Sequence, residues 1–210
     1  DNTPSYTFKS SKAGTITYGG SCSSDNTSAS AGNITINFTT LSDGTYSNCS
    51  LYVTSSTGVK GKTLSVTPFT VDTTAPSLSQ ATAVTTPTND TTPGYAFSSN
   101  EAGTISYGGS SCSPGGTSAS SGTNSISFGT LSEGSYSCTI TVTDSAGNAS
   151  SALSVNTFVV DTTAPTVSEE TPVTTPTNDN TPNYTFASTE AGTITYGGSC
   201  SSSITGATSE

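Results

Sequence analysis

The sequence predicts an all-β fold, built as a row of small β-sandwich modules joined by short linkers. Openings of the form Asp-X-Thr-Pro recur at residues 1–4, 90–93 and 179–182, so the chain repeats every 89 residues. Within each repeat, apolar and polar residues alternate as they do in half-buried strands. The sequence Val-Asp-Thr-Thr-Ala-Pro ends such a run at 71–76 and again at 160–165, where proline blocks continuation of the strand. This period suits a β-sandwich, which has about 100 residues.

The period divides the chain into three modules. Residues 1–74 form a module whose first strand is missing, residues 75–163 form a complete module, and residues 164–210 form a truncated one. Because the sequence opens inside one repeat and closes inside another, we expect it to be a window on a longer protein.

The second repeat shows the expected strands most clearly. They cover residues 77–84, 94–98, 104–107, 124–128, 136–142 and 151–160. Any strand between the third and the fourth must be short and weakly marked. In the last strand the apolar alternation changes phase between Val155 and Phe158, which predicts a β-bulge there.

A tyrosine near the start of the fifth of these strands narrows the fold. Tyr136 lies two residues before Cys138, which is the spacing of the tyrosine corner in immunoglobulin-like sandwiches. In the first repeat Tyr46 precedes Cys49 by three residues. Residues at that spacing cannot share one face of a regular strand, so a bulge is expected between them. The modules are therefore predicted to be immunoglobulin-like.

Two short motifs extend this interpretation to a family. Thr-Asp-Ser-Ala-Gly-Asn at 143–148 and Val-Asp-Thr-Thr-Ala-Pro at 160–165, together with about seven short strands, resemble the bacterial Ig-like repeats of large cell-surface adhesins and extracellular fibre proteins. The resemblance covers essentially the whole chain. It departs from antibody domains, because there is no Trp and the first Cys follows the third strand. The first repeat also lacks the turn motif and has Ser-Ser-Thr-Gly-Val at 55–59.

The five cysteines follow the repeat. Each full repeat holds a pair, and Cys200 matches the first member of each pair. Paired cysteines in small polar modules point to disulfides and an oxidising compartment. In an immunoglobulin-type topology the strands flanking each pair are neighbours in one sheet, so we expect the disulfides Cys22–Cys49 and Cys112–Cys138.

Composition excludes several functions. The formal net charge is −10, and the only four basic residues lie in the first repeat, so nucleic-acid binding is not expected. No apolar run reaches the roughly 20 residues of a membrane span. Without His there is no Ser-His-Asp triad, and the acidic residues recur in loops with the repeat, so we do not expect an enzyme. The basic residues are Lys9, Lys12, Lys60 and Lys62.

Acidic residues gather where modules meet. Because strands run alternately, the turns holding Glu101 and Asp144 lie at the upstream end of the second module, where the linker with Asp72 arrives. Such hard oxygen ligands suit Ca²⁺, and the family resemblance also implies calcium at module junctions. The next junction is expected to gather Asp161 and Glu190, with Asp90 and Glu133 nearby.

The competing interpretation is that these acids are ordinary solvated turn residues. The first repeat favours it at its own upstream end, where Lys12 and Ser55 replace the acidic pair. No other cofactor is expected.

The leading functional hypothesis is a structural stalk in a secreted or cell-surface, adhesin-like protein. Its partners are then neighbouring repeats or copies of the same chain. One alternative is a subunit of a self-assembling extracellular filament. Another is a module that binds surface glycans through Tyr18 and Tyr107, each of which lies beside a Gly-Gly pair. Packing in the core or at a strand end is the competing role for these two tyrosines.

Overall fold

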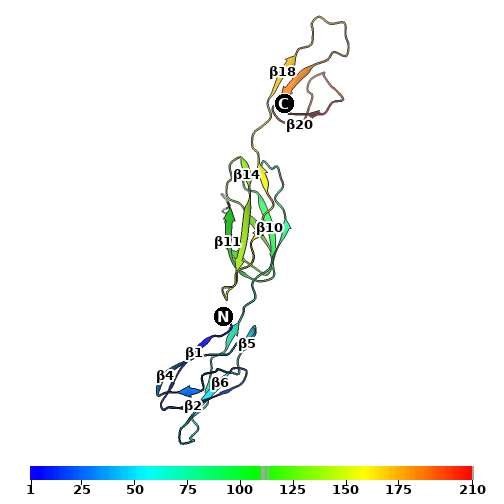
Figure 1. Cartoon of the computed structure of the whole chain (residues 1–210). Coiled ribbons are helices and arrows are strands. Elements are labelled where there is room, and N and C mark those ends of the chain that lie inside the picture. Colours follow the sequence, from blue (N-terminus) through cyan, green and yellow to red (C-terminus); the bar gives the residue numbers. More distant parts are fainter. Residues whose placement is uncertain (110–111, 113, 210) are drawn as a thin grey trace.

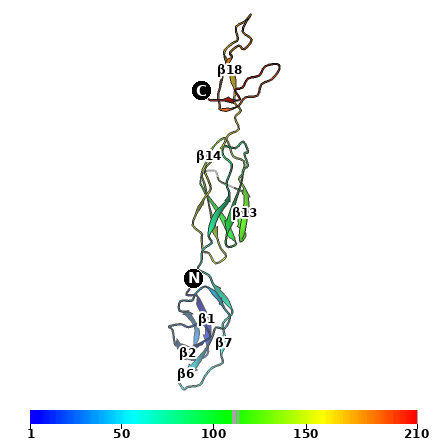
Figure 2. The same ribbon diagram turned by 90° about the vertical axis from the view of Figure 1, so that its right-hand side faces the viewer.

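The computed structural model describes residues 1–109, 112 and 114–209, and all regular structure within them is β-strand. The predicted all-β fold is confirmed. The strands form immunoglobulin-like modules that follow one another along an extended chain (Figure 1). The turned view in Figure 2 shows the same elongated arrangement. None of the described residues forms a helix that is long and apolar enough to cross a membrane. Residues 110, 111 and 113, from the predicted loop around Cys112, lie outside the described residues.

The strands fall into three groups along the chain. The first module contains β1 (Ser5–Ser10), β2 (Gly14–Gly19), β3 (Ser28–Ala29), β4 (Gly32–Asn37), β5 (Gly44–Tyr46), β6 (Ser50–Ser55), β7 (Leu64–Ser65) and β8 (Phe69–Val71). The second contains β9 (Leu78–Thr82), β10 (Gly94–Ser99), β11 (Gly103–Gly109), β12 (Ser118–Ala119), β13 (Gly122–Ser127), β14 (Gly134–Tyr136), β15 (Cys138–Thr143), β16 (Leu153–Ser154) and β17 (Phe158–Val160). The third contains β18 (Val167–Thr171), β19 (Thr185–Ser188), β20 (Gly192–Thr193) and β21 (Gly206–Ala207).

Two antiparallel sheets make up the sandwich of the second module. One has the strand order β13-β10-β9 and the other β12-β11-β15-β16, and β14 pairs with β17 in a separate two-stranded sheet. Alternate residues of each strand fill the space between them, as the period of two requires. Phe97 of β10 and Val142 of β15 are completely buried, and Ile140 is 1% exposed. The core therefore consists of the apolar positions at which the sequence alternates.

After β9 the chain crosses from one sheet to the other. Asn156 holds the crossing segment, because its side chain accepts from the Val84 amide and donates to the Val84 carbonyl, both at 3.0 Å. Thr88 then forms a parallel bridge to Val160 of β17, and its amide donates to the Val159 carbonyl at 2.9 Å. The first segment of the module thus covers an edge of both layers.

Some strands differ from the expected ones. The short strand β12 pairs with β11 and so extends the second sheet. The expected strand at 136–142 is interrupted at Ser137, since β14 pairs with β17 whereas β15 pairs with β11 and β16. The last strand is also split, because residues 155–157 belong to no strand and separate β16 from β17. Val155 and Phe158 are both buried, so both phases of the alternation reach the core through a wider interruption than a single-residue bulge.

The first module repeats this architecture without a counterpart of β9. Its sheets have the orders β1-β4, β3-β2-β6-β7 and β5-β8, and Phe8, Ile36 and Leu51 belong to its own core. Residues 47–49 belong to no strand and separate β5 from β6. This is where the three-residue spacing of Tyr46 and Cys49 predicts an irregularity. The described part of the third module has two strand pairs, β18 with β19 and β20 with β21, and most of its residues are exposed.

The tyrosine corner is present in both of the first two modules. The Tyr136 hydroxyl donates to the Ser132 carbonyl at 2.7 Å, and the Tyr46 hydroxyl donates to the Ser42 carbonyl at 2.8 Å. Both rings also stack on a phenylalanine, Tyr136 on Phe158 and Tyr46 on Phe69 of β8. The immunoglobulin-like feature predicted from the Tyr-to-Cys spacing is therefore confirmed for Tyr136, and it tolerates the extra residue after Tyr46.

Candidate functional site at the module junctions

The first linker is tied to the module it leaves by the carboxylate of Asp43. This residue directly precedes β5, and its Oδ1 accepts hydrogen bonds from the amide of Thr73 at 2.9 Å and its hydroxyl at 2.7 Å. Its Oδ2 accepts from the Thr74 hydroxyl at 2.6 Å. The hydroxyl of Thr74, followed by that of Thr73, lowers the pKa of Asp43, because these donors stabilise the charged form.

The second linker has the same attachment. Glu133 directly precedes β14 and accepts hydrogen bonds from the hydroxyls of Thr162 at 3.4 Å and Thr163 at 2.5 Å. The Thr163 hydroxyl is the main cause of the lowered pKa of Glu133. The two consecutive threonines of each linker are thus held by an acidic residue that directly precedes a strand of the preceding module.

A turn of the second module holds the first linker from the other side. Asp144 organises this turn, since its Oδ1 accepts from the amides of Ala146 and Asn148 at 2.8 Å and its Oδ2 accepts from the Asn148 side chain at 2.8 Å. Asn148 Nδ2 also donates to the Asp72 carbonyl at 3.1 Å. Burial by itself raises the pKa of Asp144, but the hydrogen bonds from Asn148 and the turn amides together lower it.

Three carboxylates predicted to converge at this junction do lie together. Carboxylate oxygens of Asp72, Glu101 and Asp144 lie within 4.8 Å of one another. Two oxygens on opposite sides of a Ca²⁺ ion are about 4.6–5.2 Å apart at ordinary bond lengths, so the spacing fits this ion. Like charges at this separation repel, and a divalent cation would remove the repulsion. The donor set therefore fits calcium, and calcium binding itself stays a prediction.

The second junction is arranged differently. Asp161 accepts from the Thr163 amide at 3.1 Å, Asp90 accepts from the Thr92 amide at 2.8 Å, and the Glu190 backbone carbonyl accepts from the Ser188 hydroxyl at 2.7 Å. Across the part of the chain that the structure describes, the only cluster of three potential ligands is the one at the first junction.

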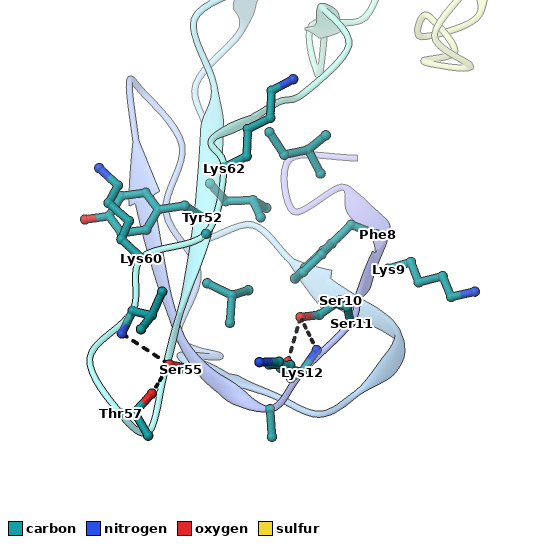
Figure 3. Close-up of a pocket in the computed structure, with 16 residues that line it drawn as sticks. Phe8, Lys9, Ser10, Ser11, Lys12, Tyr52, Ser55, Thr57, Lys60 and Lys62 are labelled. Carbon is teal, nitrogen blue, oxygen red and sulfur yellow. Dashed lines mark hydrogen bonds between the residues drawn. The ribbon is translucent and has the colours of Figure 1, made fainter.

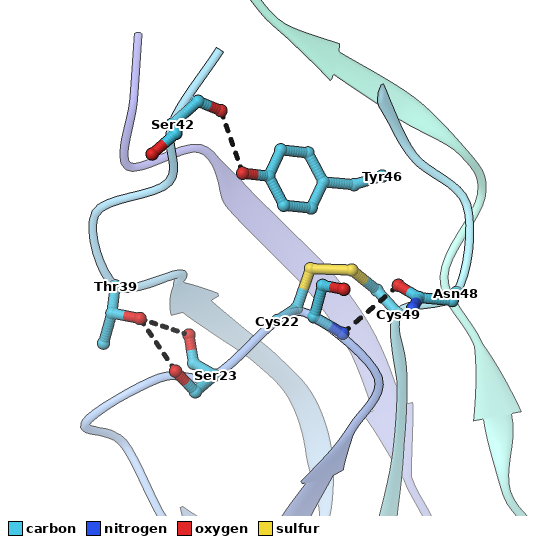
Figure 4. The surroundings of a disulfide bond; sticks show 8 residues. Cys22, Ser23, Thr39, Ser42, Tyr46, Asn48 and Cys49 are labelled. Carbon is cyan, nitrogen blue, oxygen red and sulfur yellow. Dashed lines mark hydrogen bonds between the residues drawn. A yellow bond between two sulfur atoms is a disulfide. The ribbon is translucent and has the colours of Figure 1, made fainter. Parts of the chain in front are cut away.

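The cysteines form the two expected disulfides, with Cα atoms 5.3 Å apart in Cys22–Cys49 and 5.8 Å apart in Cys112–Cys138. Cys22–Cys49 joins the loop after β2 to the residue before β6. Cys112–Cys138 joins the loop after β11 to the first residue of β15. Figure 4 shows the first disulfide below the tyrosine corner, with the Asn48 side chain accepting from the Ser21 amide at 3.2 Å. Each disulfide therefore braces its module where the fifth predicted strand is interrupted.

Tyr18 and Tyr107 use their hydroxyl groups within the fold. The Tyr18 hydroxyl donates to the Asn26 carbonyl at 2.5 Å, and the Tyr107 hydroxyl donates to the Gly116 carbonyl at 2.5 Å. Both rings are half-buried against the cores of their modules, and burial raises the pKa of each phenol. This geometry matches the packing role.

The linker attachment by Asp43 and Glu133 was not predicted from the sequence. A signal was nevertheless present, because an acidic residue followed by Gly precedes the tyrosine corner in both repeats, and both linkers carry Thr-Thr. Only the folded module shows that these distant segments meet.

The comparisons with known proteins agree with this architecture. Residues 75–162 match the family described as "Bacterial Ig-like domain". The second module is therefore a bacterial Ig-like domain, and its flanking modules repeat its sequence. No curated protein is significantly similar to the chain.

Two solved structures resemble the chain weakly. The fibronectin(III)-like modules of Clostridium thermocellum CbhA align with 16% identity and a TM-score of 0.39, over 74% of this chain and 85% of that one. The D00-D0 domain of Intimin aligns with 10% identity and a TM-score of 0.30, over 76% and 93%. Similarities at this level carry no functional argument.

Proposed function

We propose that this chain is part of the stalk of a secreted or cell-surface protein, in which successive Ig-like modules hold a distal adhesive region away from the surface. The modules themselves then perform no chemistry. The bacterial Ig-like family of the second module and its disulfide support this role, because disulfides persist in oxidising surroundings outside the cytoplasm.

One observation carries the proposal: the first linker is hydrogen-bonded to both modules that it joins. Asp43 binds the two threonines on the upstream side, and Asn148 binds the Asp72 carbonyl on the downstream side. Pro76 and the residue before it are also conformationally restricted. A linker held in this way transmits the orientation of one module to the next, which a stalk requires.

Calcium at the carboxylate cluster is a further part of the proposal. Asp72 belongs to the linker, whereas Glu101 and Asp144 belong to the second module. An ion bound to all three would therefore join the linker to the module that it enters. The stalk would then be stiffer in calcium than without it.

Small-angle scattering of the chain tests the rod at low protein concentration. We expect the parent to give the profile of an extended rod. The double variant Asp43→Ala with Glu133→Ala removes both linker attachments and frees the linkers. The maximum dimension of the chain should therefore fall, and the distribution of maximum dimensions should broaden.

The matched control removes the same charge from places that touch no linker. Asp25→Ala with Asp179→Ala should leave the profile unchanged, because Asp179 accepts from the Thr181 amide within its own turn. A compact profile of the parent chain would overturn the proposed stalk.

A further inference from the structure

The strand β4 forms a free edge of a sheet in the first module. On one side it pairs with β1 in an unbroken antiparallel register, from Ser5 opposite Asn37 to Ser10 opposite Gly32. No described strand pairs with its other side. Figure 1 shows β4 beside β1 at one side of the module. In the complete second module β13 is the corresponding outer strand, so this edge belongs to the module itself. A free edge offers its backbone groups to a further strand.

Alternate residues of β4 direct their backbone groups away from β1. The Phe38 amide donates to the Pro4 carbonyl at 3.1 Å, and the direction of these bonds alternates along an antiparallel strand. The amides and carbonyls of three residues therefore point outwards from the sheet, those of Asn33, Thr35 and Asn37. The amide of Thr39, the next outward-facing residue, donates to the Ser23 carbonyl at 2.8 Å. The part of the edge that is open to a partner is thus residues 33–37.

The sequence of this open edge reads the same in both directions. Residues 33–37 are Asn-Ile-Thr-Ile-Asn. A two-fold symmetric contact requires that where one residue meets a second, the second also meets the first. Two antiparallel copies centred on Thr35 place threonine opposite threonine, isoleucine opposite isoleucine, and Asn33 opposite Asn37. In this register the outward-facing residues face one another, and each such pair exchanges two backbone hydrogen bonds. The edge is therefore complementary to a second copy of itself.

The exposed face of β1 and β4 suits the same pairing. The hydroxyls of Thr7 and Thr35 lie 2.8 Å apart across the two strands, and a second copy would continue this row of threonines. Figure 3 shows how β1 alternates, with Phe8 directed into the module and Lys9 away from it. None of the residues on the exposed face is acidic, although the chain has a net charge of −10: Ser5, Thr7, Lys9, Asn33, Thr35 and Asn37. Two copies therefore meet without like charges directly opposite each other, and threonine pairs across strands stabilise a sheet.

β4 also lacks the features that usually protect an edge strand. Such strands commonly carry a lysine, a proline or a bulge, whereas β4 has neither residue and its register with β1 does not shift. The outer strand of the second module differs. Its residues 123–127, Thr-Asn-Ser-Ile-Ser, are not palindromic, and the Asn124 side chain donates to the carbonyls of Ser120 and Gly122 at 2.9 and 3.1 Å. The two modules therefore supply a self-complementary edge and a natural comparison for it.

We propose that β4 is a lateral docking edge for β4 of a second copy of this chain. The two strands pair antiparallel about Thr35, and the sheets of both copies join into one with the order β1-β4-β4-β1. Because the contact is two-fold symmetric, it closes on itself and gives a dimer. A contact between two strand edges is small, so the pairing is weak and reversible. This inference concerns contacts between chains and does not depend on the stalk function.

A charge swap at the two-fold centre tests the proposal by sedimentation over a range of concentrations, in a Cys200→Ser background. The parent mass should rise with concentration towards that of a dimer. Thr35→Lys and Thr35→Glu each place like charges opposite each other, so either variant alone should associate about tenfold more weakly or less. Their equimolar mixture should recover the association, because lysine then faces glutamate. Thr35 is exposed, so both variants should keep the melting temperature of the parent.

Engineered cysteines in the same background test the register. Thr35→Cys chains should form disulfide-linked dimers on mild oxidation, because facing residues of an antiparallel pair lie within disulfide reach. Asn33→Cys should crosslink to Asn37→Cys in a mixture but not to itself. Ser125 occupies the position on β13 that Thr35 occupies on β4, so it supplies the matched controls. Ser125→Cys should stay monomeric, and Ser125→Lys should associate like the parent.

Any of three results would overturn the proposal. The first is a parent chain that sediments as a monomer at every concentration. The second is a Thr35→Lys chain that associates as strongly as the parent, which would place the contact outside β4. The third is crosslinking of Thr35→Cys that is no faster than that of Ser125→Cys.

Discussion

Asp43 and Glu133 act on the linkers through the charge of their carboxylates. Hydrogen bonds to an ionised acceptor are shorter and stronger than those between neutral groups, and the Thr74 hydroxyl lies 2.6 Å from Asp43. Both acids are exposed, so the attachment stays in contact with solvent and responds to pH. A single proton on either group removes the charge that holds two threonines.

The pH dependence of Asp43 follows from its lowered pKa. A group with a lower pKa in the folded state contributes stability above its unfolded pKa of about 4, and that contribution is lost as the pH falls through the folded pKa. Asp43→Asn should therefore lower the melting temperature of the first module at pH 7. It should also reduce the fall in that melting temperature between pH 5 and pH 3. Melting curves across this range measure both effects, and Asp25→Asn is the control. Parallel pH profiles for parent and Asp43→Asn would contradict the assignment.

Single residues also show how far sequence reasoning reaches. The Tyr136 corner could be predicted, because the partners of this motif are local and its spacing is fixed. The contact between Asp43 and Thr74 could not, because it joins residues 31 positions apart whose meeting depends on where β5 begins and β8 ends. The convergence of Asp72, Glu101 and Asp144 could also be predicted. Alternating strand directions place the turns of the last two at the upstream end of the second module, where the linker arrives.

At the scale of elements, each disulfide compensates for an interrupted strand. β14 and β15 pair with different partners, so Ser137 marks a change of sheet in the middle of one apolar run. The alternation of Tyr136, Cys138 and Ile140 continues through this break, which is why the sequence predicts one strand. Cys138 opens β15 directly after the break, and its bond to Cys112 fixes that end of the strand.

Reduction of Cys112–Cys138 should destabilise the second module strongly. The bond closes a loop between residues 26 positions apart, and the chain-entropy relation gives about 3.5 kcal/mol for such a loop. Chemical denaturation of oxidised and reduced protein measures the difference. The Cys200→Ala variant should unfold like the parent. Intact-mass analysis that finds two free thiols in each full repeat before reduction would contradict the pairing.

At the scale of the whole molecule, calcium should couple modules. We expect excess calcium to raise the melting temperature of the second module relative to chelator, because an ion that binds only the folded junction stabilises it. Glu101→Gln should abolish this increase by removing one ligand of the cluster.

Glu190→Gln is the matched control for this experiment. Glu190 is the equivalent of Glu101 in the third module but has no cluster among the described residues, so its replacement should leave the calcium effect intact. Identical melting curves of the parent chain in calcium and in chelator would rule out the junction site.

The parallel bridge between Thr88 and Val160 gives the row of modules a mechanical character. A pull along the row enters the second module through its first segment and leaves through β17, and these two elements lie side by side at that bridge. Tension therefore loads their hydrogen bonds in shear, together, instead of peeling them apart in turn. Once they yield, the residues between Cys112 and Cys138 remain locked in a loop. That loop keeps roughly 90 Å of contour length at full extension from being pulled out. The disulfide therefore limits how far the module lengthens when it unfolds under tension.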